Sequence, residues 1–177
     1  MTAFCIENRI WDPAETMPRD DLRALQLARL RGLVERVAHI PFYRAAFQKH
    51  GVSKDNIRSL DDVRRLPFTT KEDMRTHYPL GFLSVSRDRI ARIHGSSGTT
   101  GKPTFVAYTS EDVRLWADLC ARFLVSGGLR PGHLVHIAFG YGLFTGGFGL
   151  HYGVERVGAA VVPAAAGNTP RQVMLIR

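Results

Sequence analysis

The order of strand-like and helix-like segments in the second half of the chain constrains the fold most. Residues 89–94 alternate apolar and polar side chains, as a strand does, and residues 104–109 form a second strand-like run. The segments that follow alternate in type, with helices over 110–126, over 146–157 and from residue 170, and strands over 134–139 and 159–163. This order predicts an α/β architecture with right-handed crossover connections.

The first 88 residues have a different pattern and are predicted to be mostly helical. Leucine and valine recur at three- and four-residue steps over 19–38, and a shorter helix is expected over 42–50. A third helix, running to about residue 77, begins with capping-box spacing at Thr69 and Glu72, or at the pair one residue later.

These patterns divide the chain into two expected parts. Residues 1–88 form a mostly helical N-terminal segment, and residues 89–177 form an incomplete α/β subdomain. The last helix starts as an amphipathic run over 172–176 with no stop signal, so we expect the chain to end inside a domain.

Two groups of side chains in the predicted helices are expected to be structural. His151 and Glu155 are one helical turn apart, but no third ligand is evident, so we expect packing or a hydrogen bond and no metal site. An apolar stripe on the helix over 110–126 is expected to lie in the core, and it consists of Trp116, Leu119, Phe123 and Leu124.

The net charge of +8 does not indicate a nucleic-acid binder. Residues 1–90 carry 16 Lys and Arg against 12 Asp and Glu, and residues 91–177 carry 8 against 4, so the charge is spread evenly. No dense basic tract or groove-reading motif is present. A basic balance also suits a protein that handles anionic small molecules.

The chain is expected to be cytoplasmic and free of membrane spans. No stretch approaches the roughly 20 apolar residues that a span requires. The first 13 residues lack the apolar core of a signal peptide. Cys5 and Cys120 lie far apart and outside any metal-ligand pattern, so free thiols in a reducing compartment are expected.

The strongest local signal is a hydroxyl-rich loop between the first two strand-like runs. It consists of Ser96, Ser97, Gly98, Thr99, Thr100, Gly101 and Lys102. Its glycines allow backbone N–H groups to approach an anion, its hydroxyls are neutral donors, and its lysine adds a positive charge. It is not a Walker A loop, because serine stands at the position of the first glycine and Pro103 follows the lysine.

The sequence SSGTTGKPT resembles the phosphate-binding signature of adenylate-forming enzymes, the superfamily of acyl-CoA synthetases. The resemblance implies that residues 96–102 bind the β- and γ-phosphates of ATP. It also implies a fold, in which a helical N-terminal segment is followed by part of the large N-terminal domain of such an enzyme.

A second segment is similar to phenylacetate-CoA ligases in particular. This aromatic segment covers residues 139–147, FGYGLFTGG, and the stretches over 41–44 and 66–73 agree with the same family. Phe139, Tyr141 and Phe144 are the expected acyl-pocket residues, because aromatic walls with glycine gaps suit a flat aryl group. The alternative is that they are core filler. Phe139 stands where a tyrosine is common, and Gly95 stands where alanine is expected.

The resemblance covers the chain from about residue 7, and it covers the first two-fifths or so of a full-length enzyme. It implies ATP-dependent ligation of CoA to phenylacetate or a related aryl acid, with ATP, Mg²⁺ and CoA as substrates and cofactor. The catalytic residues are expected beyond residue 177, so this stretch alone should be inactive. A homo-oligomer is compatible with the sequence.

Two other functions stay open from the sequence. The first is an adenylating ligase for a different carboxylate, which keeps the fold and changes the acid. The second is a non-catalytic truncated module that binds a nucleotide or a partner protein.

Overall fold

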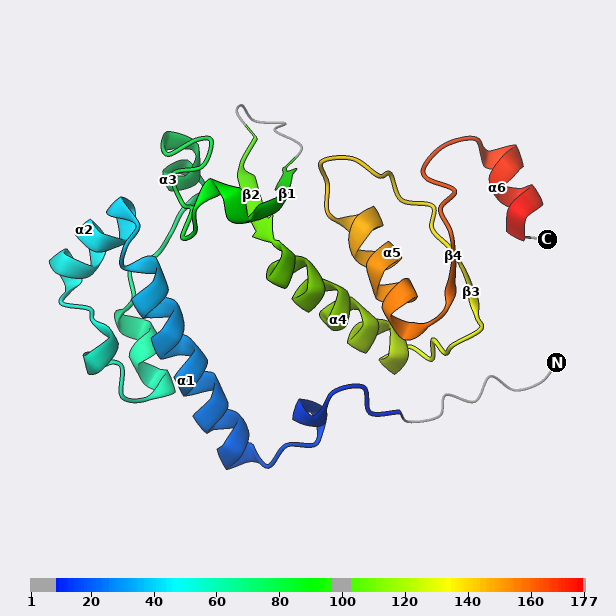
Figure 1. Ribbon diagram of the computed structural model, residues 1–177. Coiled ribbons are helices and arrows are strands. Elements are labelled where there is room, and N and C mark those ends of the chain that lie inside the picture. Colours follow the sequence, from blue (N-terminus) through cyan, green and yellow to red (C-terminus); the bar gives the residue numbers. More distant parts are fainter. Residues whose placement is uncertain (1–8, 97–102, 177) are drawn as a thin grey trace.

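The computed structural model describes residues 9–96 and 103–176, and Figure 1 shows its elements in chain order. The elements are the 3₁₀ helix η1 (Pro13–Glu15), α1 (Arg19–Val37), α2 (Pro41–His50), η2 (Lys54–Asn56), η3 (Leu60–Arg65), α3 (Lys71–Thr76), η4 (Arg87–Arg89), β1 (Ile90–Gly95), β2 (Phe105–Thr109), α4 (Ser110–Ser126), β3 (Leu134–His136), α5 (Gly146–Val157), β4 (Ala160–Val162) and α6 (Thr169–Ile176). Within the described residues, every element before β1 is helical, as predicted; the division into two domains at residue 88 stays a prediction.

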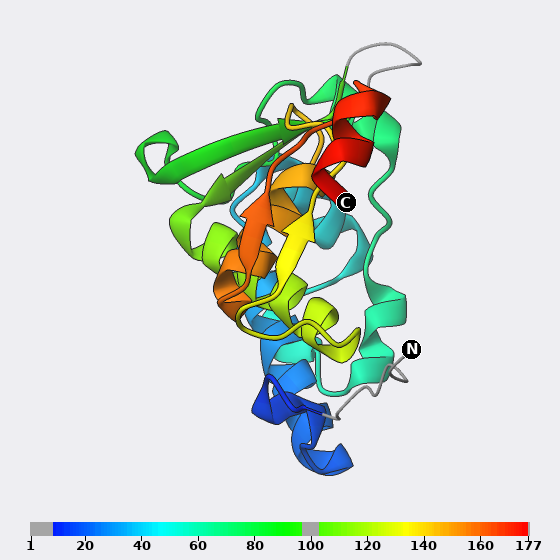
Figure 2. The same cartoon turned by 90° about the vertical axis from the view of Figure 1, so that its right-hand side faces the viewer.

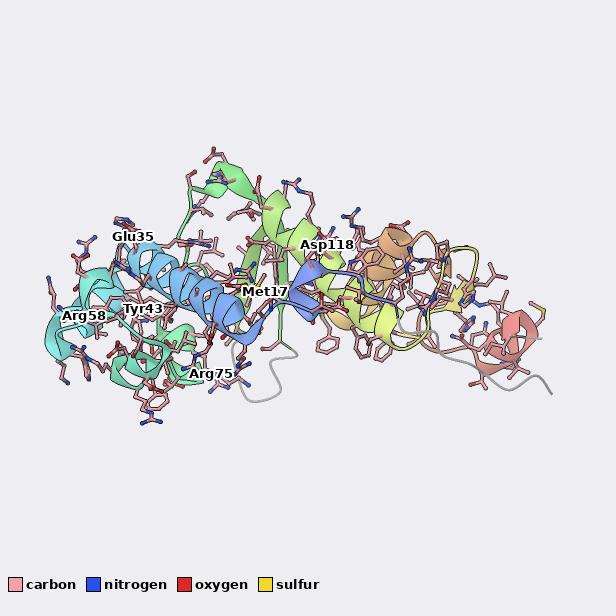
Figure 3. The ribbon with its side chains drawn as sticks, turned by 90° about the horizontal axis from the view of Figure 1, so that it is seen from below. Met17, Glu35, Tyr43, Arg58, Arg75 and Asp118 are labelled. Carbon is pink, nitrogen blue, oxygen red and sulfur yellow. The ribbon has the colours of Figure 1, made fainter. Side chains whose placement is uncertain are left out.

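The helical part has its own small core. Val34 of α1 and Phe47 of α2 pack with Val52 and Ile57, which follow α2. Gly51 ends α2 in the left-handed conformation, with φ of 61°, which a residue without a Cβ adopts at little cost. Figure 3 shows this part from below, with Glu35 on α1 and Tyr43 on α2, and with α4 and its Asp118 in the other part of the molecule.

The third helix begins at the later of the two predicted capping pairs. Thr70 is the N-cap of α3, its hydroxyl accepts a hydrogen bond from the Asp73 N–H at 3.2 Å, and the Asp73 carboxylate accepts the Thr70 N–H at 2.7 Å. The same reciprocal pair forms at α4, where Thr109 is the N-cap and Asp112 the partner. Each pair satisfies N–H groups that the first turn of a helix leaves without partners.

Replacing Thr109 with alanine should lower the free energy of unfolding by about 1 kcal/mol. Thr109 is only 7% exposed, and its hydroxyl both donates to the Asp112 carboxylate at 2.8 Å and accepts the Asp112 N–H at 3.1 Å. Urea denaturation measures the loss. Thr109→Ser keeps the hydroxyl and should lose much less, so equal losses in the two variants would show that the cap is not the cause.

Helices α4 and α5 pack closely because glycines line the α5 face. A Cβ added at Gly149 would lie 2.8 Å from Trp116 Nε1, and one added at Gly153 would lie 2.6 Å from Cys120 Cβ. The core below this contact is formed by Ala121 and Val125 of α4 with Val157 of α5, together with the partly buried Trp11 and Leu129.

Burial also acts on the cysteine in this interface. Cys120 is a free thiol, as expected, and burial raises its pKa above the ordinary value, which disfavours the reactive thiolate. Cys5 lies outside the described residues.

Strands β3 and β4 form a parallel pair, with α5 as the crossover helix between them (Figure 2). Leu134 pairs with Ala160, and His136 pairs with Val162. Strand β3 is confirmed but covers only residues 134–136 of the predicted 134–139, and Leu134 is 77% exposed whereas Ile137 is 1% exposed. The reason is that α5 covers only one face of this two-stranded sheet.

The first two strands form a separate antiparallel hairpin, with Gly95 opposite Phe105 at the loop end. Arg92 and His94 of β1 lie on its inner side, whereas Ile93 is 40% exposed. The side chains of this strand therefore alternate between an inner and an outer face, as a strand predicts, but the inner face is largely polar.

The apolar stripe on α4 is only partly in the core. Leu119 is 54% exposed and Phe123 is 68% exposed, whereas Trp116 and Leu124 are partly buried, so the expectation was wrong for the first two. The contact with α5 selects the face that carries Ala121 and Val125, because small residues allow the close approach of the two helices. In the part of the chain that the structure describes, no helix is both long enough and apolar enough to cross a lipid bilayer.

Candidate functional site

The end of β1, directly before the hydroxyl-rich loop, is joined to the aromatic segment at one backbone carbonyl. The Leu143 oxygen accepts the Gly95 N–H at 3.0 Å and the His94 ring nitrogen Nδ1 at 2.9 Å. Gly95 and His94 are the last residues of β1, and Leu143 lies in the middle of the aromatic segment. The aromatic segment therefore contacts the end of the strand that leads into the hydroxyl-rich loop.

Ser96 and Thr104 close the base of the loop. The Ser96 N–H donates to the Thr104 carbonyl at 3.1 Å, and the Ser96 hydroxyl lies 3.1 Å from both the Thr104 N–H and the Thr104 hydroxyl. The Ser96 side chain thus links the ends of the hairpin, and its role as a phosphate donor stays a prediction. The other predicted phosphate-binding residues, Ser97 to Lys102, lie outside the described residues.

Gly95, the departure from the expected alanine, has a steric reason. A Cβ at this position would lie 3.1 Å from Cδ1 and Cε1 of the Phe105 ring on the paired strand. The ring of Phe105 thus lies against the backbone at the end of β1, and glycine leaves room for it there.

The aromatic segment turns back on itself before α5 begins. A Cβ added at Gly147 would lie 2.7 Å from the Gly140 carbonyl oxygen, so this turn requires glycine. Phe139 and Phe144 both lie near Gly146, at 3.5 Å and 3.1 Å from a Cβ added there. They are 53% and 62% exposed in this chain.

Tyr141, the third predicted pocket residue, lies in a chain of polar contacts that ends at Glu155. Its hydroxyl is 3.1 Å from His151 Nδ1, and His151 Nε2 is 3.3 Å from the Glu155 carboxylate. With Nε2 donating to the carboxylate, Nδ1 accepts the tyrosine proton. Burial raises the pKa of Tyr141, and the negative charge of Glu155 raises it further, so the hydroxyl stays neutral and keeps its donor role.

The expected pair of His151 and Glu155 is thus present, and it acts on Tyr141. No group of three or more histidine, cysteine or acidic side chains that could hold a metal ion occurs among residues 9–96 and 103–176.

A cavity of about 500 Å³ lies away from the aromatic segment. It is bounded by the stretch from Pro79 to Val85 and by β2, and neither Phe139, Tyr141 nor Phe144 lines it. Phe139 and Phe144 are exposed, whereas Tyr141 is partly buried against the rings of Phe148 and His151.

Comparison with curated proteins connects these features to a family. The chain is 53% identical over 164 residues to the phenylacetate-coenzyme A ligase of Thermus thermophilus, which is 92% of this chain and 37% of the relative. It is 50% identical to the phenylacetate-coenzyme A ligase of Aromatoleum evansii, over 94% of this chain and 38% of the relative. It is 47% identical to that of Escherichia coli, over 97% of this chain and 40% of the relative. No family model matches the chain.

The chain belongs to the phenylacetate-CoA ligase family. It spans less than half the length of these relatives. The fold agrees with this family, because the structure matches the N-terminal part of a solved 2-hydroxyisobutyryl-CoA ligase. The TM-score is 0.83 at 34% sequence identity, over 92% of this chain and 36% of that one. That crystal structure contains 2-HIB-AMP and CoA. An open conformation of the same ligase matches with a TM-score of 0.82 at 32% identity, over 92% of this chain and 39% of that one.

Sequence reasoning missed two residues of β1 that organise this region. Arg92 lies over the rings of Phe148 and Tyr152, at 5.1 Å and 4.7 Å from their centres, and donates to the Tyr152 hydroxyl at 2.9 Å. His94 is 3% exposed. The signal was available, because Arg92 and His94 share the inward side of the strand with Ile90.

Proposed function

We propose that the protein with this sequence ligates CoA to phenylacetate or a related aryl acid through an acyl-adenylate, and releases AMP and pyrophosphate. The observation that carries the proposal is the shared Leu143 carbonyl, which holds the base of the hydroxyl-rich loop against the aromatic segment. Adenylation needs the phosphates of ATP and the carboxylate side by side, and this contact joins the aromatic segment to the strand end that leads into the loop. The names of the curated relatives support the same acid.

The reaction has two steps in this proposal. The carboxylate oxygen attacks the α-phosphorus of ATP, the bond to the bridging oxygen breaks, and pyrophosphate leaves. The thiolate of CoA then attacks the acyl carbon and AMP leaves. Donors from residues 96–102 contact the β- and γ-phosphates and stabilise the charge that grows on pyrophosphate in the first step.

The aromatic segment is proposed to hold the acid. Phe139 and Phe144 offer apolar faces to an aryl ring, and Tyr141 offers a hydroxyl whose proton is directed to His151. ATP and CoA are proposed as substrates of the complete protein, with Mg²⁺ bound to ATP. A cytoplasmic location and the absence of nucleic-acid partners stay predictions.

Replacing Phe144 with alanine should raise the KM for phenylacetate about 10-fold, because the proposed contact between the Phe144 ring and the bound aryl acid is lost. Because Phe144 is 62% exposed, the truncation should leave the melting temperature nearly unchanged. Steady-state kinetics with phenylacetate and a small aliphatic acid measure the effect. A variant that loses stability but keeps its preference between the two acids would argue that Phe144 has only a packing role.

The test of the proposed function is pyrophosphate release with ATP-Mg, CoA and a panel of carboxylic acids. The product of the complete reading frame is compared with the 177-residue chain. Release that depends on phenylacetate, from the product of the complete reading frame, would support the proposal. No release with any acid would favour a non-catalytic module.

A second acid class has support from one observation. The solved relative at 34% identity is a 2-hydroxyisobutyryl-CoA ligase. A ligase for another carboxylate is therefore the second candidate, and the panel separates it from the first, because the acid with the highest kcat/KM identifies the class.

A further inference from the structure

His94 lies where four elements and the aromatic segment meet. His94 is 3% exposed, and three aromatic rings lie next to its ring. The ring centres of Tyr108 on β2, Trp116 on α4 and Phe148 on α5 are 5.6, 5.4 and 5.8 Å away, all in edge-to-face arrangements. Such a site would also accept a phenylalanine ring on grounds of shape.

The polar atoms of His94 show what the histidine adds to shape. A carbonyl oxygen only accepts hydrogen bonds, so the contact of 2.9 Å with Leu143 places the ring proton on Nδ1. In the neutral ring Nε2 is then an acceptor, and it is buried with no hydrogen-bond partner in the described part of the chain. An unpartnered buried acceptor costs stability, so packing alone would favour phenylalanine.

The bond from His94 therefore serves the position of Leu143. Together with the Gly95 N–H, it fills both lone pairs of the Leu143 oxygen. Leu143 lies between Tyr141 and Phe144, two of the proposed pocket residues. Gly95 is followed directly by Ser96, which closes the base of the hydroxyl-rich loop.

We propose that His94 is a positioning residue that fixes the aromatic segment against the base of the hydroxyl-rich loop. In this way it fixes the position of the bound acid relative to the phosphates of ATP. This proposal rests on the proposed function. His94 contacts neither substrate and acts through the Leu143 carbonyl. A misplacement of about 1 Å between reacting groups can lower a rate 100-fold, so loss of this bond should affect adenylation.

Two variants separate the hydrogen bond from the packing. His94→Phe keeps a ring of similar shape and removes the donor. His94→Asn removes much of the ring but keeps an amide N–H near the position of Nδ1. Acid-dependent pyrophosphate release is measured on the product of the complete reading frame. His94→Phe should lower kcat for this step about 10- to 100-fold, and His94→Asn should recover most of the loss although it packs less well.

A second readout does not depend on activity. Hydrogen–deuterium exchange is followed in peptides that cover residues 90–95 and 139–147. His94→Phe should exchange faster in both peptides, and His94→Asn should stay close to the wild type. Ile93→Ala is the matched control, because Ile93 is 40% exposed on the other side of β1, and it should change neither kcat nor exchange in the aromatic segment.

The outcomes distinguish the two proposals. If His94→Phe keeps wild-type kcat and exchange, or if His94→Asn is as impaired as His94→Phe, the positioning role is overturned. If the wild type releases no pyrophosphate with any acid, the proposed function fails. The exchange data then decide whether the contact between His94 and Leu143 holds the two stretches together.

Discussion

Replacing Gly153 with alanine is expected to lower the free energy of unfolding by about 1–3 kcal/mol, the usual cost of overpacking a tight contact. The added methyl group would lie 2.6 Å from Cys120 Cβ and 3.0 Å from the Cys120 carbonyl carbon. Backbone atoms cannot rotate away, so α4 and α5 must separate. The loss is expected even though alanine favours a helix over glycine by about 1 kcal/mol.

Gly32 is the matched control for this experiment. It lies inside α1, where a Cβ would meet nothing within 4 Å. Gly32→Ala should therefore raise the free energy of unfolding by up to about 1 kcal/mol. If the contact between α4 and α5 is as close as described, the urea midpoints of the two variants shift in opposite directions relative to the wild type. Stabilisation in both variants would contradict the glycine-dependent packing.

Replacing Lys102 with alanine is expected to lower the rate of adenylation about 100-fold, which is typical for removal of one donor to a group that gains charge in the transition state. Lys102 is proposed to contact the β- and γ-phosphates, and the charge on these groups grows as pyrophosphate leaves. The effect should appear in kcat for pyrophosphate release. Transfer of the acyl group from a supplied acyl-adenylate to CoA should be unaffected, because pyrophosphate has already left.

Lys49→Ala is the control for loss of a positive charge. Lys49 is exposed at the end of α2, far along the chain from the proposed site, and its removal should leave both half-reactions unchanged. An unchanged rate of pyrophosphate release in Lys102→Ala would show that this lysine has no part in the first step. A similar loss in Lys49→Ala would point to general electrostatics instead.

The helix boundaries were readable from the sequence because their signals are local. The capping pair of Thr109 and Asp112 lies three residues apart, and it marks the start of α4 within a single turn. Gly51 and Gly158 stop α2 and α5 in the left-handed conformation. The prediction of a helix over 146–157 was confirmed, although the segment is rich in glycine.

The faces that these elements bury were decided by tertiary packing. Four apolar residues on α4 were expected in the core, but the glycines of α5 allow close approach on the side of Cys120 and Val125, so Phe123 is left exposed. In β1 the inward side carries Arg92 and His94, because aromatic rings of α4 and α5 receive these polar groups.

The sequence by itself determined that a hydroxyl-rich loop and an aromatic segment occur in this chain, because each is a run of neighbouring residues with a recognisable composition. Only the tertiary structure decided how the strand that leads into the loop contacts the aromatic segment. The contact joins the ring of His94 to the backbone oxygen of Leu143, 49 residues further along the chain. Every residue has a backbone carbonyl, so an acceptor of this kind leaves no mark in a sequence, and its partner is selected by the packing of the elements around it.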